Sequence, residues 1–373
     1  MMISQVPDIM MYHEEYFVYP VLVALKADKS RYPIPDRAIG MRLRDLSWQD
    51  ENKNLSEMTR INTDDKSYFQ YGSGTNSIHK FYLEGNDIVL TPTISGTPTG
   101  SLEMEIYLRP NQLVKTNRAA TITNFISKIT VTNASITAGD TITIMKTDFI
   151  AGTDFVIGAT ETITAANIVT AVNAKALTGL TATSSSGVVT LTFDDLANSQ
   201  SVSATDTVAF AVNSTQIIAF NSVATTWTNP DTNVVEDLFK AGALVDFLQT
   251  KPGHRIRAFD IKIPASGISG VTITFTRADV PDTLIVGDYI CLANESIIPY
   301  IPPDLHNVLA ERTSSRILAA IGDTQGLQVS MTKLSEMEKQ QGTLLDNRVD
   351  GAPQKVLSRH SLLRYGRSSN RSR

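Results

Sequence analysis

Residues 102–108, Leu-Glu-Met-Glu-Ile-Tyr-Leu, decide the fold class, because apolar and polar side chains alternate closely along them. A period of two places alternate side chains on opposite faces of a strand, so the pattern is typical of a half-buried strand. Upstream, residues 81–83 and 88–90 are apolar runs that flank Glu84-Gly85-Asn86-Asp87. This sequence predicts a tight turn with Gly85 and Asn86 at positive φ. Residues 78–109 therefore predict a series of β-hairpins.

More strands are expected on both sides of these hairpins. Upstream, a short helix is expected to begin at Asp8. It is followed by strands over residues 16–25 and 39–48 and by extended backbone at the two prolines of residues 31–35. Downstream, residues 234–248 fit either a helix or a pair of strands, and clear strand patterns follow at residues 259–263, 271–275 and 285–292, the last interrupted at Gly287-Asp288.

Residues 131–216 differ in composition from the rest of the chain. They contain 18 threonines in 86 positions, and two bases against seven acids give them a net charge of −5. Strands are expected at residues 141–145, 154–157, 180–183, 188–193 and 207–212. A helix is expected over residues 165–175, with Thr162 or Thr164 as N-cap and with three apolar side chains toward a sheet, Ile168, Val169 and Val172. This segment therefore predicts a separate α+β module.

Two amphipathic helices are expected after this β-rich part, over about residues 303–320 and 324–346. In the first, one i, i+4 row contains Leu305, Leu309, Ile317 and Ile321, with Val308 and Leu318 beside it. In the second, one face contains Leu327, Met331, Leu334, Met337 and Leu344. The short turn at Gly322-Asp323 predicts that the helices form an antiparallel hairpin.

The predicted fold class is therefore α+β. It comprises a mainly antiparallel β domain with an inserted small α+β module, a C-terminal antiparallel helical hairpin and an extended C-terminal arm. The expected divisions are a discontinuous β-rich core (1–130 and 217–302), the insert (131–216), the hairpin (303–347) and the arm (348–373).

The C-terminal arm has seven bases and one acid, a net charge of +6. A basic arm can bind nucleic acid by releasing counterions, or dock into an acidic groove of a protein and become ordered there. The third possibility is a solvated tail with no function. The candidate partner-binding residues are Arg348, Lys355, Arg359, Arg364, Arg367, Arg371 and Arg373.

No motif predicts a catalytic residue, a metal site or a cofactor. The candidate carboxylate pairs are Asp64-Asp65, Asp194-Asp195, and Glu103 with Glu105. Glu103 and Glu105 are two residues apart on a strand and so share one face. This arrangement suits the solvated face of an antiparallel strand better than an acid/base pair or a cation site. The glycine-rich residues 72–75 lack a following Lys-Ser/Thr and are expected to form a loop. Cys291 is expected to be a buried, inert thiol. No two of the five histidines, His13, His79, His254, His306 and His360, have metal-site spacing.

Overall composition narrows the class of protein. A chain of 373 residues is long enough for two or three domains. One cysteine excludes a disulfide within the chain and leaves little scope for a cysteine-based zinc site. The net charge of −5 does not suggest a nucleic-acid binder. No stretch approaches the roughly 18 apolar residues of a membrane span, and the first twelve residues do not suggest a secretory signal.

Several segments together resemble the head-to-tail adaptor (neck, connector) proteins of tailed bacteriophages. The resemblance spans most of residues 12–118 and 218–352. It lies in RYPIPDRAIG (31–40) with RLRD (42–45), FYLEGNDIVL (81–90), LRPNQLV (108–114), VGDYI (286–290) and IPPDLH (301–306). Residues 137–214 separately resemble a small module inserted in phage structural proteins, through GDTITI (139–144), TAANI (164–168) and GVVTLT (187–192). The sequence departs from the adaptor pattern in two ways: it contains the extra insert, and its N-terminal helical part is expected to be reduced.

The resemblance implies a structural virion protein and no enzyme. Such a protein would form a homo-oligomeric ring, expected to hold twelve copies, that joins the portal protein to the tail or to further neck proteins. It would extend the DNA channel without sequence-specific contacts and would need no cofactor and no membrane. The implied location is the virion neck, after synthesis in the host cytoplasm.

Two other functions remain open at this point. One is a phage tail or baseplate component, or a receptor-binding protein, with an Ig-like display module; it predicts a trimer or hexamer. The other is an enzyme, for example a β-rich glycan hydrolase. That function requires two carboxylates roughly 5–10 Å apart in a cleft.

Overall fold

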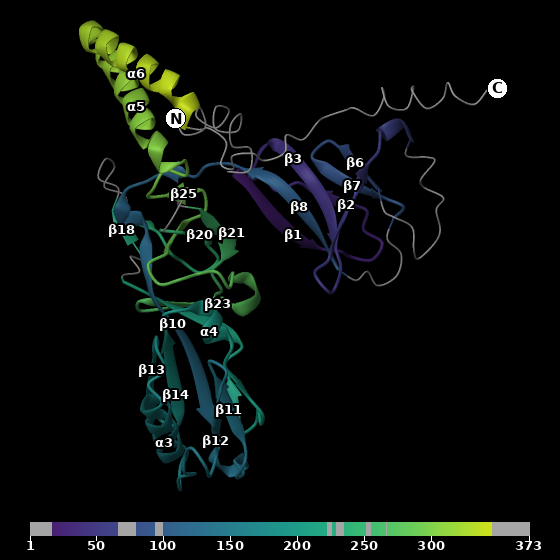
Figure 1. The fold of residues 1–373 in the computed structure, drawn as a ribbon, viewed down its shortest axis with the longest axis vertical. Helices are drawn as coiled ribbons and strands as arrows, with labels where there is room; N and C mark the ends of the chain where they lie inside the picture. The colour runs from purple at the N-terminus through teal and green to yellow at the C-terminus, as the bar shows by residue number, and fades with distance from the viewer. Residues whose placement is uncertain are drawn as a thin grey trace, which may run out of the picture. The chain divides into compact units, whose positions relative to one another are not determined.

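The computed structural model describes residues 17–65, 80–93, 100–221, 226–228, 235–250, 255–265 and 267–344. Within them the fold is α+β, with several antiparallel sheets and a C-terminal pair of antiparallel helices, which confirms the predicted class (Figure 1). The chain divides into two compact units. The first contains the described residues up to Arg109 and those from Ala310, and the second is Pro110–Leu309. The helix expected at Asp8 and the basic arm lie outside the described residues.

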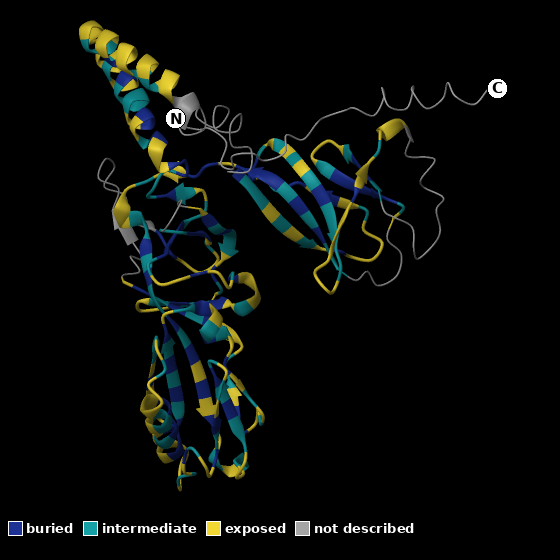
Figure 2. Ribbon diagram, in the orientation of Figure 1, coloured by how far each residue is buried: buried dark blue, intermediate teal, exposed yellow. Residues whose placement is uncertain are grey.

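Two four-stranded sheets make up the β part of the first unit. One has the strand order β1-β8-β3-β4 and consists of β1 (Val18–Ala24), β3 (Ala38–Gln49), β4 (Leu55–Glu57) and β8 (Ser101–Leu108). The other has the order β2-β7-β6-β5 and consists of β2 (Arg31–Pro33), β5 (Thr59–Arg60), β6 (Lys80–Glu84) and β7 (Asp87–Thr91). The alternation along β8 is confirmed, since Leu102, Met104 and Ile106 are fully buried (Figure 2).

The turn between β6 and β7 was predicted to have two residues at positive φ, and it has one. Gly85 has a φ of +63°, but Asn86 is not among the residues with positive φ. One positive φ at the first central position is typical of a type II′ turn, which suits the right-handed twist of a hairpin as well as type I′ does.

One long strand, β10 (Ala120–Val131), organises the second unit. It pairs with β24 at its start, with β17 along its middle, and with β14 and β16 towards its end. The sheet follows the order β21-β20-β24-β10-β17-β23-β22, and β14, β16 and β13 are attached to this path. These strands are β13 (Leu180–Ser185), β14 (Val188–Phe193), β16 (Phe210–Val212), β17 (Thr215–Phe220), β20 (Leu244–Leu248), β21 (Ile256–Lys262), β22 (Ile268–Ser269), β23 (Thr272–Thr276) and β24 (Tyr289–Leu292).

The threonine-rich segment does not have a core of its own. Its buried side chains, such as Ile142 and Ile168, belong to one hydrophobic cluster with Phe247, Phe275 and Ile290 of the rest of the unit. The expected boundary between residues 130 and 131 falls at the last residue of β10, and β10 pairs both with β14 inside the segment and with β24 after it. The chain therefore divides at Arg109/Pro110 rather than at the composition change.

Within this segment, one strand of the small sheet β12-β11-β15 lies earlier in the chain than predicted. The sheet consists of β11 (Thr141–Ile144), β12 (Thr147–Ile150) and β15 (Ser203–Ala204), whereas the strand was expected at residues 154–157. Met145 and Lys146, at φ of +51° and +62°, form a two-residue turn directly after β11. Two positive φ values are typical of a type I′ turn, but these residue types do not signal one.

The helix of the segment begins earlier than expected. Helix α3 (Glu161–Ala174) has Thr160 as its N-cap, and the Thr160 side chain accepts a hydrogen bond from the Ile163 backbone N–H. Thr164 instead is buried, accepts a hydrogen bond from Gly158 N at 2.8 Å and donates one to Asn133 Oδ1 at 2.6 Å. Ile168 and Val172 are buried and Val169 packs against the core, as predicted. The short helix α4 (Leu196–Gln200) was not expected.

The remaining elements settle one open alternative. Residues 234–248 contain two strands, β19 (Val235–Asp237), which pairs with β18 (Thr226–Thr228), and β20. A parallel pair joins β9 (Gln112–Leu113) to β25 (Glu295–Ser296). A 3-10 turn, Pro303–Leu305, leads into α5 (His306–Ile321), and Gly322 at φ +82° precedes α6 (Thr324–Leu344).

The shared core predicts that the threonine-rich segment unfolds together with the rest of its unit. Phe125 is fully buried in β10 and lies opposite Phe193 of β14 and Ile218 of β17. Phe125→Ala is expected to lower the free energy of unfolding by about 3–5 kcal/mol. Hydrogen exchange should accelerate alike in residues 131–216 and 217–302, whereas the exposed control Val208→Ala should change little. Faster exchange confined to residues 131–216 contradicts the shared core.

Candidate functional site

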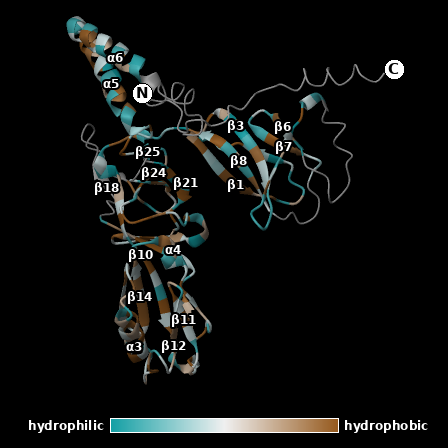
Figure 3. Ribbon diagram, in the orientation of Figure 1, coloured by the Kyte–Doolittle hydropathy of each residue, from teal (hydrophilic) through white to brown (hydrophobic). Residues whose placement is uncertain are grey.

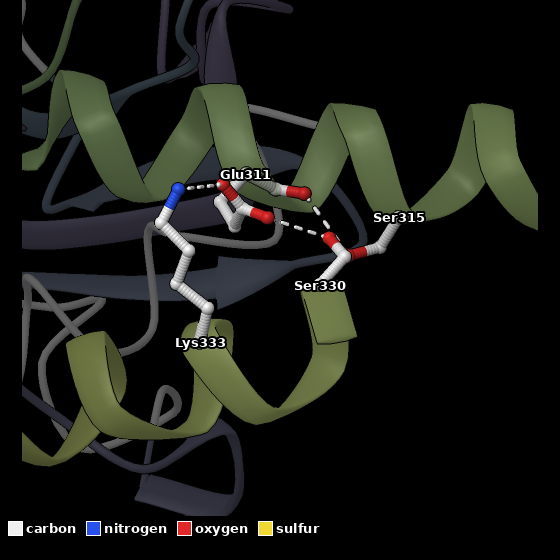
Figure 4. A network of polar contacts seen from close by, with 4 residues as sticks. All are labelled: Glu311, Ser315, Ser330 and Lys333. Atoms are coloured by element: carbon white, nitrogen blue, oxygen red, sulfur yellow. Dashed lines mark hydrogen bonds and ion pairs between the residues drawn. The ribbon is translucent and has the colours of Figure 1, made fainter. Parts of the chain in front are cut away.

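Polar side chains lie at the centre of the contact between α5 and α6, here called the polar seam. Ser315 of α5 and Ser330 of α6 are 8% and 5% exposed, and their hydroxyl oxygens are 2.8 Å apart. The Ser330 hydroxyl donates to Glu311 Oε1 at 2.6 Å, and Lys333 Nζ lies 3.0 Å from Glu311 Oε2 (Figure 4). These contacts set the position of α6 along α5 through directional bonds.

A second ion pair connects the same two helices. Arg312 donates from Nε and Nη2 to Glu338 Oε1, at 3.0 and 2.7 Å. The Arg312 side chain is 20% exposed and that of Glu338 is 39% exposed, so solvent screens this ion pair and the pair adds little stability by itself. Near the turn, Asp323 Oδ1 accepts a hydrogen bond from Gly326 N at 2.9 Å and so caps the start of α6. Much of both helices is hydrophilic (Figure 3).

The apolar row of α5 points away from this seam. Ile317 is two residues from Ser315, which places it about 200° around the helix. Leu305 and Leu309 at the base of the row are buried, but Ile317 and Ile321 are 52% and 73% exposed. The row is therefore packed at one end and open to solvent at the other, which leaves an apolar stripe, defined here as Ile317 and Ile321.

Helix α6 also exposes apolar side chains. Its row toward α5 consists of Leu327, Ser330, Leu334 and Met337, so the expected face is correct at Leu327, Leu334 and Met337 and wrong at Met331. Met331 is 58% exposed and Val329 is 70% exposed. The polar Ser330 takes the central position because it bonds to Glu311, an interaction that an apolar pattern cannot reveal.

A cluster of polar groups in the second unit joins the segments around Asn111, Asp246 and Asn294. Asp246 is fully buried; its Oδ2 accepts from Asn111 Nδ2 at 2.8 Å and from Asn294 N at 3.1 Å, and its Oδ1 accepts from Asp260 N at 3.0 Å. Arg118 donates from Nε and Nη2 to the two carboxylate oxygens of Glu295, at 3.0 and 2.6 Å. These contacts fix the segment that enters the unit after Pro110 beside the segment that leaves it toward α5.

Two of the three predicted carboxylate pairs have identifiable structural roles. Glu103 and Glu105 lie on one face of β8, as expected, with Arg44 Nη1 3.7 Å from Glu105 Oε2. Partial burial, and then the charge of Glu105, raise the pKa of Glu103. Asp195 is the N-cap of α4, since its side chain accepts from Asn198 N. Asp64 and Asp65 belong to a 3-10 turn over Thr63–Asp65.

The other candidate residues are dispersed. Cys291 is fully buried in β24, and burial raises the pKa of its thiol. His306 Nε2 lies 3.3 Å from Ile301 O at the start of α5. In the described part of the chain, no group of three His, Cys, Asp or Glu side chains is placed to hold a metal ion, and no helix has the length and apolarity to span a membrane.

Several predicted residues lie outside the described residues. These are all seven bases of the arm, residues 72–75 and the histidines His13, His79, His254 and His360.

No protein-family model matches the chain, and no curated protein is significantly similar to it.

The polar seam predicts an acid-sensitive hairpin. The hydrogen bond from Ser330, and then the interaction with Lys333, lower the pKa of Glu311 below its usual value of 4.5. The stabilisation from ionised Glu311 is therefore complete above pH 4.5 and is lost as the pH falls through the lowered pKa of the folded state. The helical signal by circular dichroism should melt at a lower temperature at about pH 3 than at about pH 7.

The matched variant is Glu311→Gln, which keeps a hydrogen-bond acceptor without the charge. It should melt below the wild type at neutral pH and should show a smaller change between the two pH values. The same change with pH in wild type and variant contradicts the role of Glu311.

Proposed function

We propose that this chain is a structural subunit of a phage neck, a head-to-tail adaptor that assembles into a ring between portal and tail. The observation that supports this most is the hairpin itself. Its two helices meet through a polar seam, while the apolar stripe of α5 faces solvent. An amphipathic helix normally buries its apolar face, so the stripe favours a contact supplied by another subunit.

The exposed residues suit a ring better than a two-fold dimer. In a cyclic ring each subunit presents one patch to one neighbour and a different patch to the other, whereas a two-fold interface uses one patch twice. The hairpin offers two different patches, the stripe on α5 and Met331 on α6. Packing of the first patch against the second of the next subunit would repeat around a ring.

The proposed partners follow the resemblance described above. The ring would contact the portal protein on one side and the tail or further neck proteins on the other, with DNA passing through its lumen. The basic arm would serve as a portal-docking element. Its charge of +6 suits an acidic crevice.

The stripe predicts the oligomeric state. Full burial of an isoleucine is worth about 1.5–3 kcal/mol, so Ile317→Asp with Ile321→Asp should weaken association at least about a hundredfold. Native mass spectrometry should show a closed ring, expected to contain twelve copies, for the wild type and monomer for the double variant. Val208→Asp, at a residue that is 65% exposed elsewhere in the chain, is the control and should assemble normally.

A wild-type monomer contradicts the proposed function. A trimer or hexamer supports the tail, baseplate or receptor-binding alternative instead. Circular dichroism of the double variant at equal concentration verifies that both helices still form.

The arm gives a separate prediction in particles. Deletion of residues 348–373 removes seven bases and one acid. Heads carrying the truncated chain should package DNA but fail to join tails, as counted by electron microscopy and plaque titre. Joining at the wild-type level contradicts a docking role for the arm and leaves the ring proposal untouched.

A further inference from the structure

The outward face of the sheet β1-β8-β3-β4 carries four carboxylates. Strand register places Glu103 opposite Leu22 of β1 and opposite Ser47 of β3, which in turn lies opposite Glu57 of β4. The neighbouring row contains Glu105 and Asp45. Directly opposite residues of antiparallel strands project to the same side, so the carboxylates of Asp45, Glu57, Glu103 and Glu105 share one face, here called the acidic sheet face.

This face also exposes apolar side chains at both edges of the sheet. Leu22 on β1 is 56% exposed and Leu55 on β4 is 53% exposed. Leu55 lies opposite Gln49, which lies opposite Ser101, so it projects to the same side as the carboxylates. A surface that combines leucines with carboxylates suits a partner that is both apolar and basic.

Two arginines lie toward one end of this face. Arg44 pairs with Glu105, and the Arg42 guanidinium lies 4.8 Å from the centre of the Tyr107 ring. Among the described residues no cation pairs with Glu57 or Glu103, and Glu103 accepts only a 3.4 Å hydrogen bond from Gln49 Nε2. Partial burial, and then the charge of Glu105, raise the pKa of Glu103, and an incoming cation would favour the ionised carboxylate.

The chain itself contains a segment of complementary chemistry. Residues 355–367, KVLSRHSLLRYGR, hold four bases and no acid, and they also hold five apolar residues, Val356, Leu357, Leu362, Leu363 and Tyr365. Phosphate contacts would use only the bases, whereas a docking surface with leucines uses both kinds of side chain. The 23 residues from 345 to 367 span at most about 75–80 Å, so the segment can reach across a domain of ordinary size.

We propose that residues 355–367 of this chain dock on the acidic sheet face, with bases against Glu57 and Glu103 and apolar side chains against Leu22 and Leu55. Docking would cover the exposed leucines and compensate the two unpaired carboxylates. The inference does not rest on the proposed function, because it concerns only this chain and holds whether or not the chain forms a ring. It assigns the arm an internal binding site, which a partner of the arm would have to displace.

Cysteine crosslinking tests the proposal in the full-length chain. The sole natural cysteine, Cys291, is fully buried and so leaves an unreactive background. Ser47→Cys places a thiol in the row between Glu103 and Glu57, and Ser361→Cys places one in the middle of the docking segment. The control pair combines Ser361→Cys with Thr183→Cys, an exposed residue of β13 in the other unit.

Under mild oxidation the test pair should crosslink at least about tenfold faster than the control pair, because docking raises the local thiol concentration. Addition of Glu57→Lys, at an exposed position, or of about 0.5 M salt should reduce the rate toward that of the control. A crosslinked monomer identifies the arm of the same molecule as the ligand. A crosslinked dimer whose yield rises with protein concentration identifies the arm of a neighbouring copy as the ligand.

Two results overturn the proposal. One is a test-pair rate equal to that of the control pair, which is expected if the arm binds only nucleic acid or another protein. The other is a fast rate that neither Glu57→Lys nor salt reduces, because the contact then does not depend on the carboxylates. Both results are independent of the oligomeric state, so failure here is distinguishable from failure of the ring proposal.

Discussion

The buried carboxylate of Asp246 is the constraint on which the arrangement of the second unit depends. A carboxylate removed from water is tolerated only where donors replace its hydration, and here Asn111 Nδ2 and two backbone N–H groups do so. One of those donors belongs to the segment that enters the unit and another directly precedes β25. Together with the bidentate pair of Arg118 and Glu295, Asp246 therefore holds the segment that enters the unit beside the segment that leads toward α5.

The hairpin beyond that base follows a different stabilising principle. Serine hydroxyls and ion pairs give direction and register, but each contributes only about 0.5–1.5 kcal/mol net, less than a buried leucine at the same position. Leu327, Leu334 and Met337 add apolar contacts toward α5, but Ile317, Ile321, Val329 and Met331 remain exposed. A helical pair built in this way is well defined in register yet incomplete in burial, which suits an element whose stability is completed by contact with another subunit.

Local patterns in the sequence predicted the elements that are set by short-range physics. Period-two alternation predicted β8, and the helix boundaries near Pro303 and Gly322 followed from capping rules. Elements set by long-range contacts were missed. The turn at Met145-Lys146 is imposed by the pairing of β11 with β12, and the polar seam depends on Glu311, Ser315 and Ser330 meeting across two helices. The shared core was not predicted, because a composition change does not reveal which strands pair with β10 across it.

The two proposals for the arm, portal docking and docking on the acidic sheet face, are linked through competition. An arm that is docked for nine-tenths of the time binds any other partner about tenfold more weakly, because only the undocked fraction is competent. A single free subunit is therefore a poor ligand for that partner. A ring presents all its arms to one partner at once, and simultaneous engagement raises the overall affinity well above that of one arm. Competition from the sheet face thus favours partner binding after the subunits have assembled over binding before it, and a weak internal site orders the steps of assembly without any change of fold.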